Sequence, residues 1–126
     1  MPGLRGLAAL TVTDADTAVA LRSGEVPTLA TPRLVALLEA ASVAARDGCL
    51  GTGETSVGMR VHIDHLAPSA PGSLVDAEVV LEAVEGRRLT FTGTAWVNDD
   101  VVARATIVRV VVETDRFLTR VSGGAA

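Results

Sequence analysis

The sequence predicts an α+β domain in which one long helix is buried against a face of an antiparallel sheet. The segment from Pro32 to Asp47 is apolar on almost every side, which is typical of a buried helix. Four long strand-like runs follow it, separated by turn residues. A chain of 126 residues can bury a sizeable core. We therefore expect one domain over residues 1–126, frayed at 1–6 and 122–126.

The region before the main helix is expected to hold a first strand and a turn. The apolar run from Leu7 to Val12 has the length of a strand. Asp14 and Asp16 follow, either in a solvated loop or as caps of a short helical turn over 15–21. No third acidic residue lies near them, so we expect no metal site there. The loop over 23–27 would lie close to the start of the main helix, where a substrate entrance is expected.

The main helix carries its own start and stop signals. Thr31 before Pro32 is typical of an N-cap followed by the proline favoured at the first helical position. Gly48 is expected to end the helix. Glu39 lies in the middle, and a carboxylate among leucines and alanines needs an explanation.

The rest of the chain is predicted to be a meander of antiparallel strands. Glu85-Gly86 and the segment 98–100 are the turns between the later strands. The last strand is apolar at odd and even positions alike, so we expect it in the interior of the sheet. The predicted strands are 55–66, 73–84, 88–97 and 101–113.

The first strand after the helix has one apolar face that ends in a histidine. Side chains of one parity share a face of a strand. The odd-numbered face should contact the helix, whereas His62 belongs to the polar face and should be exposed. A helix lying across the apolar face would bring Thr31, Glu39 and His65 together. The predicted apolar face consists of Val57, Met59, Val61, Ile63 and His65.

These three residues carry a family resemblance. Glu39 follows Thr31 by 8 positions and His65 follows Glu39 by 26, a pattern that resembles the fluoroacetyl-CoA thioesterase family of hotdog-fold proteins. The resemblance extends over roughly residues 26–121. Further matching segments are Thr55 to Gly58, Pro71-Gly72 and Val84 to Leu89.

The resemblance implies a hotdog fold, in which one central helix is wrapped by an antiparallel sheet, and acyl-CoA thioesterase activity. It implies that Thr31, Glu39 and His65 act together on the thioester of a coenzyme A substrate. It also implies a homodimer or a higher homo-oligomer with the active site at the interface, so the helix of one subunit could face the histidine of another. Thioester cleavage needs an attacking oxygen, a proton acceptor and donors for the oxyanion, and the division of these roles stays open.

Gly58 and Arg109 are candidate substrate-binding residues. The resemblance places Gly58 beside the triad, where a glycine allows close backbone approach; a bulge or tight packing is the alternative. Arg109 interrupts an apolar strand, and such a charge needs either an anionic ligand or an ion pair, for example with Glu39.

Each member of the triad also has a purely structural explanation. Thr31 is accounted for as a helix cap, and His65 as a hydrogen-bonded core histidine. Glu39 shares its helix side with Ser42 and Arg46, which could form a solvated stripe. The alternative functions are a non-catalytic acyl-CoA binding or sensing domain and a structural dimer scaffold.

Two features depart from the family pattern. Ile107 stands where members often carry a histidine in the last strand. Members specific for fluoroacetyl-CoA have a phenylalanine-bearing lid before the helix, whereas the two phenylalanines here are Phe91 and Phe117. The sequence therefore predicts an open entrance that does not reject ordinary acyl groups.

Composition excludes several other classes of protein. The net charge is −4, aromatic residues make up 2%, and the chain contains no basic cluster, which argues against nucleic-acid binding. Cys49 is the single cysteine, so no internal disulfide and no CxxC metal motif can form. We expect no metal and no redox cofactor. No signal peptide or membrane span is evident, so we expect a cytoplasmic protein that does not associate with membranes.

Overall fold

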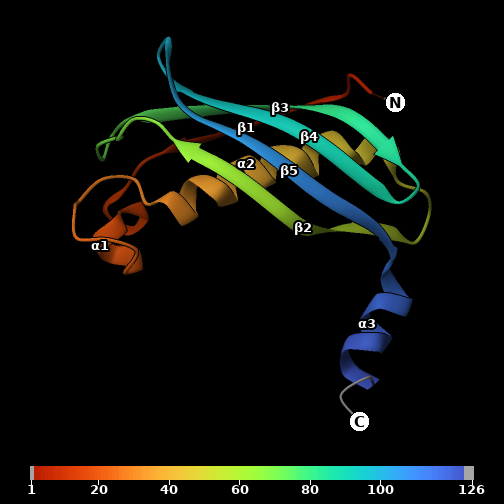
Figure 1. Ribbon diagram of the computed structural model, residues 1–126. Coiled ribbons are helices and arrows are strands. Elements are labelled where there is room, and N and C mark those ends of the chain that lie inside the picture. Colours follow the sequence, from red (N-terminus) through yellow and green to blue (C-terminus); the bar gives the residue numbers. More distant parts are fainter. Residues whose placement is uncertain (1, 124–126) are drawn as a thin grey trace.

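The computed structural model describes residues 2–123 as one curved sheet with a long helix on its concave side (Figure 1). The sheet has five strands in the order β1-β3-β4-β5-β2, and every neighbouring pair is antiparallel. β5 is an interior strand, as predicted. The elements are β1 (Arg5–Thr11), η1 (Asp14–Asp16), α1 (Ala18–Leu21), α2 (Thr31–Arg46), η2 (Asp47–Cys49), β2 (Glu54–His65), β3 (Leu74–Glu85), β4 (Arg88–Val97), β5 (Asp100–Glu113) and α3 (Thr114–Gly123).

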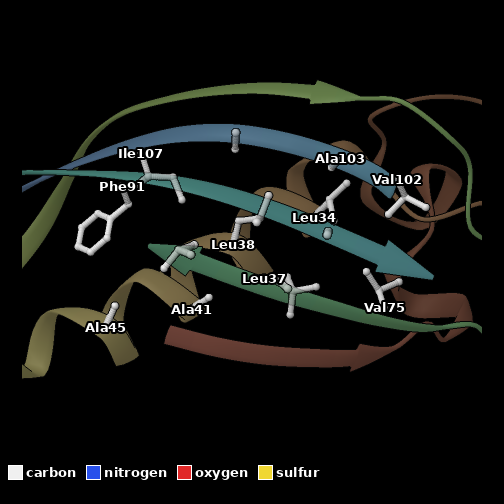
Figure 2. Packing of buried hydrophobic residues seen from close by; sticks show 14 of the residues in the cluster. Leu34, Leu37, Leu38, Ala41, Ala45, Val75, Phe91, Val102, Ala103 and Ile107 are labelled. Atoms are coloured by element: carbon white, nitrogen blue, oxygen red, sulfur yellow. The ribbon is translucent and has the colours of Figure 1, made fainter. Parts of the chain in front are cut away.

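One side of α2 forms the core together with the inner face of the sheet (Figure 2). Buried leucines and alanines recur at helical spacing along this side and contact strands β3, β4 and β5. The composition of α2 suggested a helix that is buried on all sides. A second stripe of small residues on α2 is exposed, so this expectation is wrong. The exposed stripe consists of Pro32, Ala36, Ala40 and Ala44; the core residues on α2 are Leu34, Leu37, Leu38, Ala41 and Ala45.

Gly6 sets how closely the helix approaches β1. A Cβ atom at this position would lie 2.0 Å from the carbonyl oxygen of Ala41 and 2.6 Å from the amide nitrogen of Ala45. Both atoms belong to the α2 backbone, which cannot move aside as a flexible side chain can. The absence of a side chain at residue 6 therefore allows direct contact between the strand and helix backbones.

The helix begins one residue earlier than predicted. Thr31 is already the first helical residue and Ala30 is the N-cap, so the prediction that Thr31 caps the helix is wrong. Its hydroxyl instead lies on the outside of the first turn and is free to contact another element. The helix ends at Arg46, and Gly48 lies in the short 3₁₀ turn that follows.

A β-bulge in β2 changes which side chains face α2. The pairing register with β5 shifts between Gly58 and Arg60, so two residues of β2 oppose one of β5. Before the bulge the inner face carries Ser56 and Gly58, which the sequence placed outside; after it, the odd-numbered residues face inward as predicted. The predicted inner positions of Val57 and Met59 are wrong, because an inserted residue reverses strand parity. The inward residues after the bulge are Val61, Ile63 and His65.

Both chain ends are more ordered than the sequence suggested. Backbone hydrogen bonds join residues 3 and 4 to Leu81, and β1 starts at Arg5, so the predicted frayed segment 1–6 extends too far. Residues 122 and 123 end α3, a helix that was not predicted; residues 124–126 lie outside the described part of the chain. No helix among residues 2–123 is long and apolar enough to cross a membrane.

The outer face of the sheet is mostly polar, with one aromatic side chain. Trp96, the single tryptophan, pairs with Asp76 of β3 at the end of the sheet where β1 lies. Leu7 and Ala9 of β1 line the same shallow depression. This face lies on the opposite side of the sheet from α2.

Replacing Gly6 with alanine should destabilise the fold. The new Cβ would overlap backbone atoms of α2, and overpacking of this kind costs about 1–3 kcal/mol. Urea unfolding of Gly6→Ala should therefore show a lower free energy of unfolding than wild type. Gly123→Ala is the control, because nothing lies within 4 Å of its added Cβ. Equal stability of Gly6→Ala and wild type would contradict the observed helix–strand contact.

Candidate active site

The first residue of α2 and the last residue of β2 meet through their side chains. A hydrogen bond of 2.8 Å joins Thr31 Oγ1 and His65 Nδ1. A hydroxyl bonded to an imidazole nitrogen is the arrangement in which a base can activate a nucleophile. The other ring nitrogen, Nε2, is buried and has no hydrogen-bond partner among residues 2–123.

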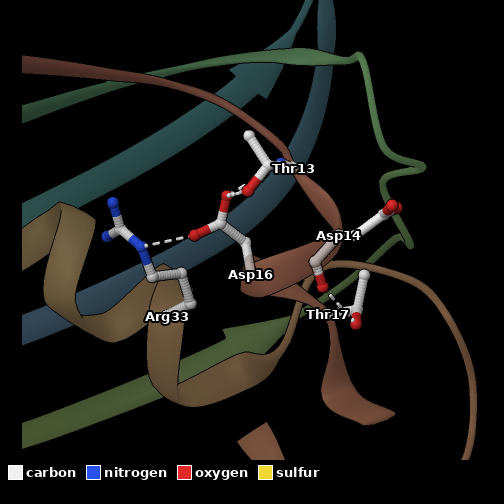
Figure 3. A network of polar contacts seen from close by, with 5 residues as sticks. All are labelled: Thr13, Asp14, Asp16, Thr17 and Arg33. Atoms are coloured by element: carbon white, nitrogen blue, oxygen red, sulfur yellow. Dashed lines mark hydrogen bonds and ion pairs between the residues drawn. The ribbon is translucent and has the colours of Figure 1, made fainter. Parts of the chain in front are cut away.

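A polar network in the preceding segment fixes the first turn of α2 (Figure 3). The Asp16 carboxylate accepts hydrogen bonds from the backbone N–H and the hydroxyl of Thr13, at 2.8 and 2.9 Å. Its other oxygen accepts from Arg33 Nε at 3.0 Å, and Arg33 lies two residues after Thr31. The Thr13 backbone bond, with Arg33 adding to it, lowers the pKa of Asp16 below its usual value. The cap of α1 is Thr17, whereas Asp16 forms a capping box with Thr13 at the short 3₁₀ turn η1. Through Arg33, Asp16 also anchors the start of α2.

The threonine–histidine pair lies in the wall of an open cavity of about 330 Å³. The loop after α1 and the segment that follows β2 form the rest of the wall, so the entrance lies where the sequence placed it. The loop contributes no aromatic side chain. The remaining lining residues are Ala18, Ser23, Gly24, Val26, Thr28, Leu29, Leu66, Ala67 and Pro68.

Glu39 lies in a second polar cluster further along α2. Its carboxylate oxygen Oε2 is 3.5 Å from Arg109 Nη1, the ion pair that the sequence left as an alternative role for Arg109. The Arg109 side chain is 8% exposed and donates to Ser56 Oγ at 2.8 Å and to the Ser56 carbonyl at 3.2 Å. Burial lowers the pKa of Arg109, and the Glu39 charge opposes that shift. An arginine nevertheless remains protonated in proteins, so the pair is ionic.

Gly58 is required by the position of this carboxylate. A Cβ at residue 58 would lie 2.7 Å from Glu39 Oε2 and 3.8 Å from Arg109 Nη1. The glycine therefore gives Glu39 room beside the strand backbone. This steric role is the tight packing that the sequence allowed as an alternative to substrate binding.

The two clusters are separate within one chain. Thr31 and Glu39 are eight positions apart on a straight helix, which places their Cα atoms about 12 Å apart. Glu39 contacts the Gly58 end of the inner face, whereas Thr31 contacts His65 at the other end. The expectation that a helix across this strand would gather all three residues is therefore wrong for a single chain.

Comparisons with known proteins identify the family of this chain. A model of the fluoroacetyl-CoA-specific thioesterase family matches residues 12–115. The chain belongs to this family. A fluoroacetyl-CoA thioesterase of Streptantibioticus cattleyicolor is 35% identical over 92 residues, which are 73% of this chain and 66% of that protein.

Solved structures of family members and of other hotdog proteins have the same fold. The fluoroacetyl-CoA thioesterase FlK superposes with a TM-score of 0.90 at 29% identity, over 98% of this chain and 96% of that one. A hot-dog-like protein from Thermanaerovibrio acidaminovorans gives a TM-score of 0.90 at 29% identity, over 99% and 93% of the two chains. The predicted family, hotdog fold and enzyme class, a thioester hydrolase, are confirmed.

The departures from the family pattern have structural counterparts in this thioesterase-family chain. Ile107, at the position where the family pattern led us to expect a histidine, is fully buried in the hydrophobic core. Phe91 is also buried in the core, and Phe117 lies on α3. Neither phenylalanine belongs to the cavity wall of this chain.

One residue of these two clusters was not found from the sequence. Ser56, which holds Arg109, was assigned to the outer face because the bulge was not anticipated. The proximity of Thr31 to His65 was predicted, but the partner of Glu39 was left open. Ser56 pairs with Val111, two residues after Arg109 in β5, so a small polar residue near a lone arginine was the available signal.

Burial lowers the pKa of His65 below its usual value of 6.5, against a smaller opposing effect of the nearby Ala67 backbone. The imidazole is therefore mainly neutral at neutral pH. A neutral imidazole with Nδ1 next to the Thr31 hydroxyl can accept a proton from it.

The Asp16 network should give a stability difference that depends on pH. Because its pKa is lowered in the folded chain, Asp16 stabilises the fold above about pH 3.8, and this contribution is lost as the pH falls through the folded-state pKa. Asp16→Asn keeps an acceptor oxygen but removes the negative charge, so it should lose about 1 kcal/mol at pH 7, the difference between charge-assisted and neutral hydrogen bonds. The deficit relative to wild type should shrink between pH 4 and about pH 2, measured by urea unfolding.

Asp14→Asn is the matched control for this experiment. Asp14 contributes its backbone carbonyl to the network, as an acceptor from Thr17 Oγ1 at 2.8 Å, and that group survives the substitution. A deficit of Asp16→Asn that stays constant over the whole pH range would show that the carboxylate charge does not stabilise the helix start.

Proposed function

We propose that this chain hydrolyses acyl-CoA thioesters at a site formed by Thr31 and His65 of one subunit and Glu39 of a second subunit. The observation that carries the proposal is the 2.8 Å contact between the Thr31 hydroxyl and His65 in the wall of a cavity. The 12 Å spacing along α2, estimated above, supports the need for a second subunit, because Glu39 does not reach this pair within one chain.

The proposed reaction divides the work among the three side chains. His65 Nδ1 takes the proton as Thr31 Oγ1 attacks the thioester carbonyl, and the positive end of α2 stabilises the oxyanion. The C–S bond then breaks, and the imidazolium returns its proton to the leaving CoA thiolate. Glu39 next takes a proton from a water that attacks the acyl-threonine ester. It passes this proton to Thr31 Oγ1 as the ester C–O bond breaks, which releases the acid and regenerates the threonine hydroxyl and the Glu39 carboxylate. Water is the only other reactant, so the proposal includes no metal and no cofactor.

The edge strand β2 is the proposed contact between subunits. One side of this 12-residue strand pairs with β5, and its other side is an open edge of the sheet. A long open edge tends to pair with another strand. Small and apolar side chains of this chain are also left uncovered, namely Met59 of β2 and the exposed stripe of small residues on α2. Two copies joined at this edge would form a homodimer with one continuous sheet.

Charges on the outer face of β2 favour one register. Arg60 and Asp64 are exposed and lie two residues on either side of His62. If two copies pair antiparallel about His62, each Arg60 lies opposite the Asp64 of the other copy, and opposite charges at such positions are stabilising. Because Met59 is the extra residue of the bulge, the same register places Gly58 of one copy opposite His65 of the other. Glu39, which lies beside Gly58, would then lie close to the second copy's His65.

Coenzyme A thioesters are the proposed substrates, and the acyl group is not restricted to fluoroacetyl. The cavity wall lacks aromatic side chains that could close over a small acyl group. We place the activity in the cytoplasm, where acyl-CoA is available. A non-catalytic acyl-CoA binder on the same fold would change its melting temperature with ligand but release no thiol, so an assay of thiol release separates the two functions.

Substitutions in the proposed triad should slow turnover. His65→Ala and Glu39→Gln should each lower kcat by about 10² or more, the usual effect of losing a positioned base or acid. Glu39→Gln should also accumulate the acyl-Thr31 ester, detectable by mass spectrometry of the intact protein. Thr31→Ser should retain activity, and Thr31→Ala should lose it without the cost of a lost cap, because Ala30 is the N-cap.

His62→Ala is the histidine-matched control for this series, since its ring lies on the outer face of the sheet. It should keep kcat within a few-fold when assayed as the assembled protein. Wild-type thiol release by correctly folded Glu39→Gln and His65→Ala would remove the basis for the proposed mechanism.

A charge exchange should test the proposed dimer. Arg60→Asp alone and Asp64→Arg alone should weaken the dimer, because each places like charges opposite one another across the two-fold axis. The double variant Arg60→Asp/Asp64→Arg restores opposite charges and should restore the dimer mass in light scattering. Wild type that is a monomer near 12.9 kDa at micromolar concentration, or single variants that dimerise as wild type does, would refute this register.

A further inference from the structure

The C-terminal helix α3 lacks a covering surface in its own chain. It has ten residues, none of them buried, and its main contact within the chain is with the end of β5. In Figure 1 it leaves β5 and extends away from both the sheet and α2. An isolated helix of this length is marginal in water, so a surface outside the chain would stabilise it.

The helix has an apolar side and a basic side. Phe117, Leu118 and Val121 follow helical spacing, and Leu118 and Val121 are more than half exposed. Arg116 and Arg120 lie one turn apart, and neither forms an ion pair with another residue in the range 2–123. In a chain of net charge −4, two arginines without counter-charges suit an anionic ligand.

The position of α3 relative to β2 decides where it would lie in the proposed dimer. The backbone N–H of Thr114 donates to the carbonyl of Gly53 at 2.9 Å, so α3 starts beside the residue that precedes β2. The cavity lies at the opposite end of β2, at His65 and Leu66. Antiparallel pairing of two β2 strands about His62 exchanges these ends. It places α3 of one copy level with the loop that follows His65 in the other.

The end of the molecule that holds the cavity exposes apolar side chains, which could pack against the apolar side of α3. Val19 and Leu21 of α1 and Val26 and Leu66 of the cavity wall are each more than two-fifths exposed. The acidic residues exposed in the same region are Asp14 and Glu25.

We infer that α3 of one subunit covers the cavity entrance of the other and presents Arg116 and Arg120 to the phosphate groups of the substrate's coenzyme A. The inference rests on the proposed function for its substrate and for the β2 contact. Guanidinium groups bind phosphate oxygens in paired hydrogen bonds, and coenzyme A carries phosphates at the end remote from the thioester. The acyl end would lie at Thr31 and His65, while the nucleotide end would contact the second subunit. The site is thus incomplete without the partner helix.

The test compares two thioesters of the same acyl group. One is an acyl-CoA that wild type hydrolyses, and the other is its N-acetylcysteamine analogue, which has the thioester but no phosphate. For Arg116→Gln/Arg120→Gln we expect KM for acyl-CoA to rise about tenfold or more, with kcat nearly unchanged. The kcat/KM for the analogue should stay within about twofold of wild type. Arg5→Gln/Arg104→Gln removes the same charge from β1 and the outer face of β5, and should leave both substrates unaffected.

A binding measurement makes the test independent of turnover. Calorimetric titration with coenzyme A and with adenosine 3′,5′-bisphosphate should give a Kd about tenfold weaker for Arg116→Gln/Arg120→Gln than for wild type. If this variant and wild type have equal Kd and equal KM, the inference is overturned. The same result is expected if the two arginines pair with Asp14 or Glu25 of the second subunit instead of with phosphate. Absence of thiol release by wild type, together with the Kd change, would refute the proposed function and leave this inference standing.

Mixed dimers show whether α3 acts on the other subunit. His65→Ala subunits have an intact α3, and Arg116→Gln/Arg120→Gln subunits have an intact threonine–histidine pair. Mixing and re-forming dimers should restore the wild-type KM for acyl-CoA in the heterodimer, because the working cavity receives α3 from the His65→Ala subunit. A KM that stays raised would place the arginines at their own subunit's site and overturn the inference.

Discussion

The β-bulge in β2 is the feature on which the site depends. Gly58 and His65 are seven positions apart, so in a regular strand the two positions would face opposite sides of the sheet. The register shift between Gly58 and Arg60 turns both toward α2. It thereby aligns one helix with two polar contacts, Glu39 beside Gly58 and Thr31 beside His65. The same shift directs Arg60, His62 and Asp64 to the outer face, away from the reacting groups.

α2 acts as a rigid spacer between these contacts. Its core side is fixed by packing on the sheet and by the backbone contact at Gly6, and its start is fixed by Asp16. The ion pair with Arg109, itself held by Ser56, keeps the Glu39 carboxylate from being an uncompensated charge among apolar residues. The start and the middle of the helix therefore each present one half of a site. In the proposed symmetric dimer, the Thr31–His65 pair of each subunit would meet Glu39 of the other, which forms two sites. The distance between Thr31 and Glu39 along α2 is therefore compatible with catalysis.

Local patterns in the sequence carried most of the fold. Alternation identified all four later strands to within a residue or so, and the apolar run with Pro32 identified α2. The errors arose where a tertiary contact outweighs a local rule. Thr31 has the chemistry of a cap, but its hydroxyl bonds to a histidine 34 positions away. The bulge adds one residue without a distinctive sequence signal, so it inverted the faces assigned to Ser56 and Met59. No residue of α3 is buried in its own chain. Rules based on hydrophobic periodicity identify helices that bury one side, so they did not identify this one.

The place of Trp96 determines what spectroscopy can report on this protein. It is the single tryptophan in a chain without tyrosine, so near-ultraviolet absorbance and intrinsic fluorescence come almost entirely from one indole ring. That ring sits on the outer face of the sheet beside Asp76, with the whole thickness of the sheet between it and α2. Emission will therefore follow the loss of the sheet on unfolding and remain nearly silent when a molecule enters the cavity. Fluorescence titrations would report an occupied site as empty, and optical concentration measurements rest on that one chromophore.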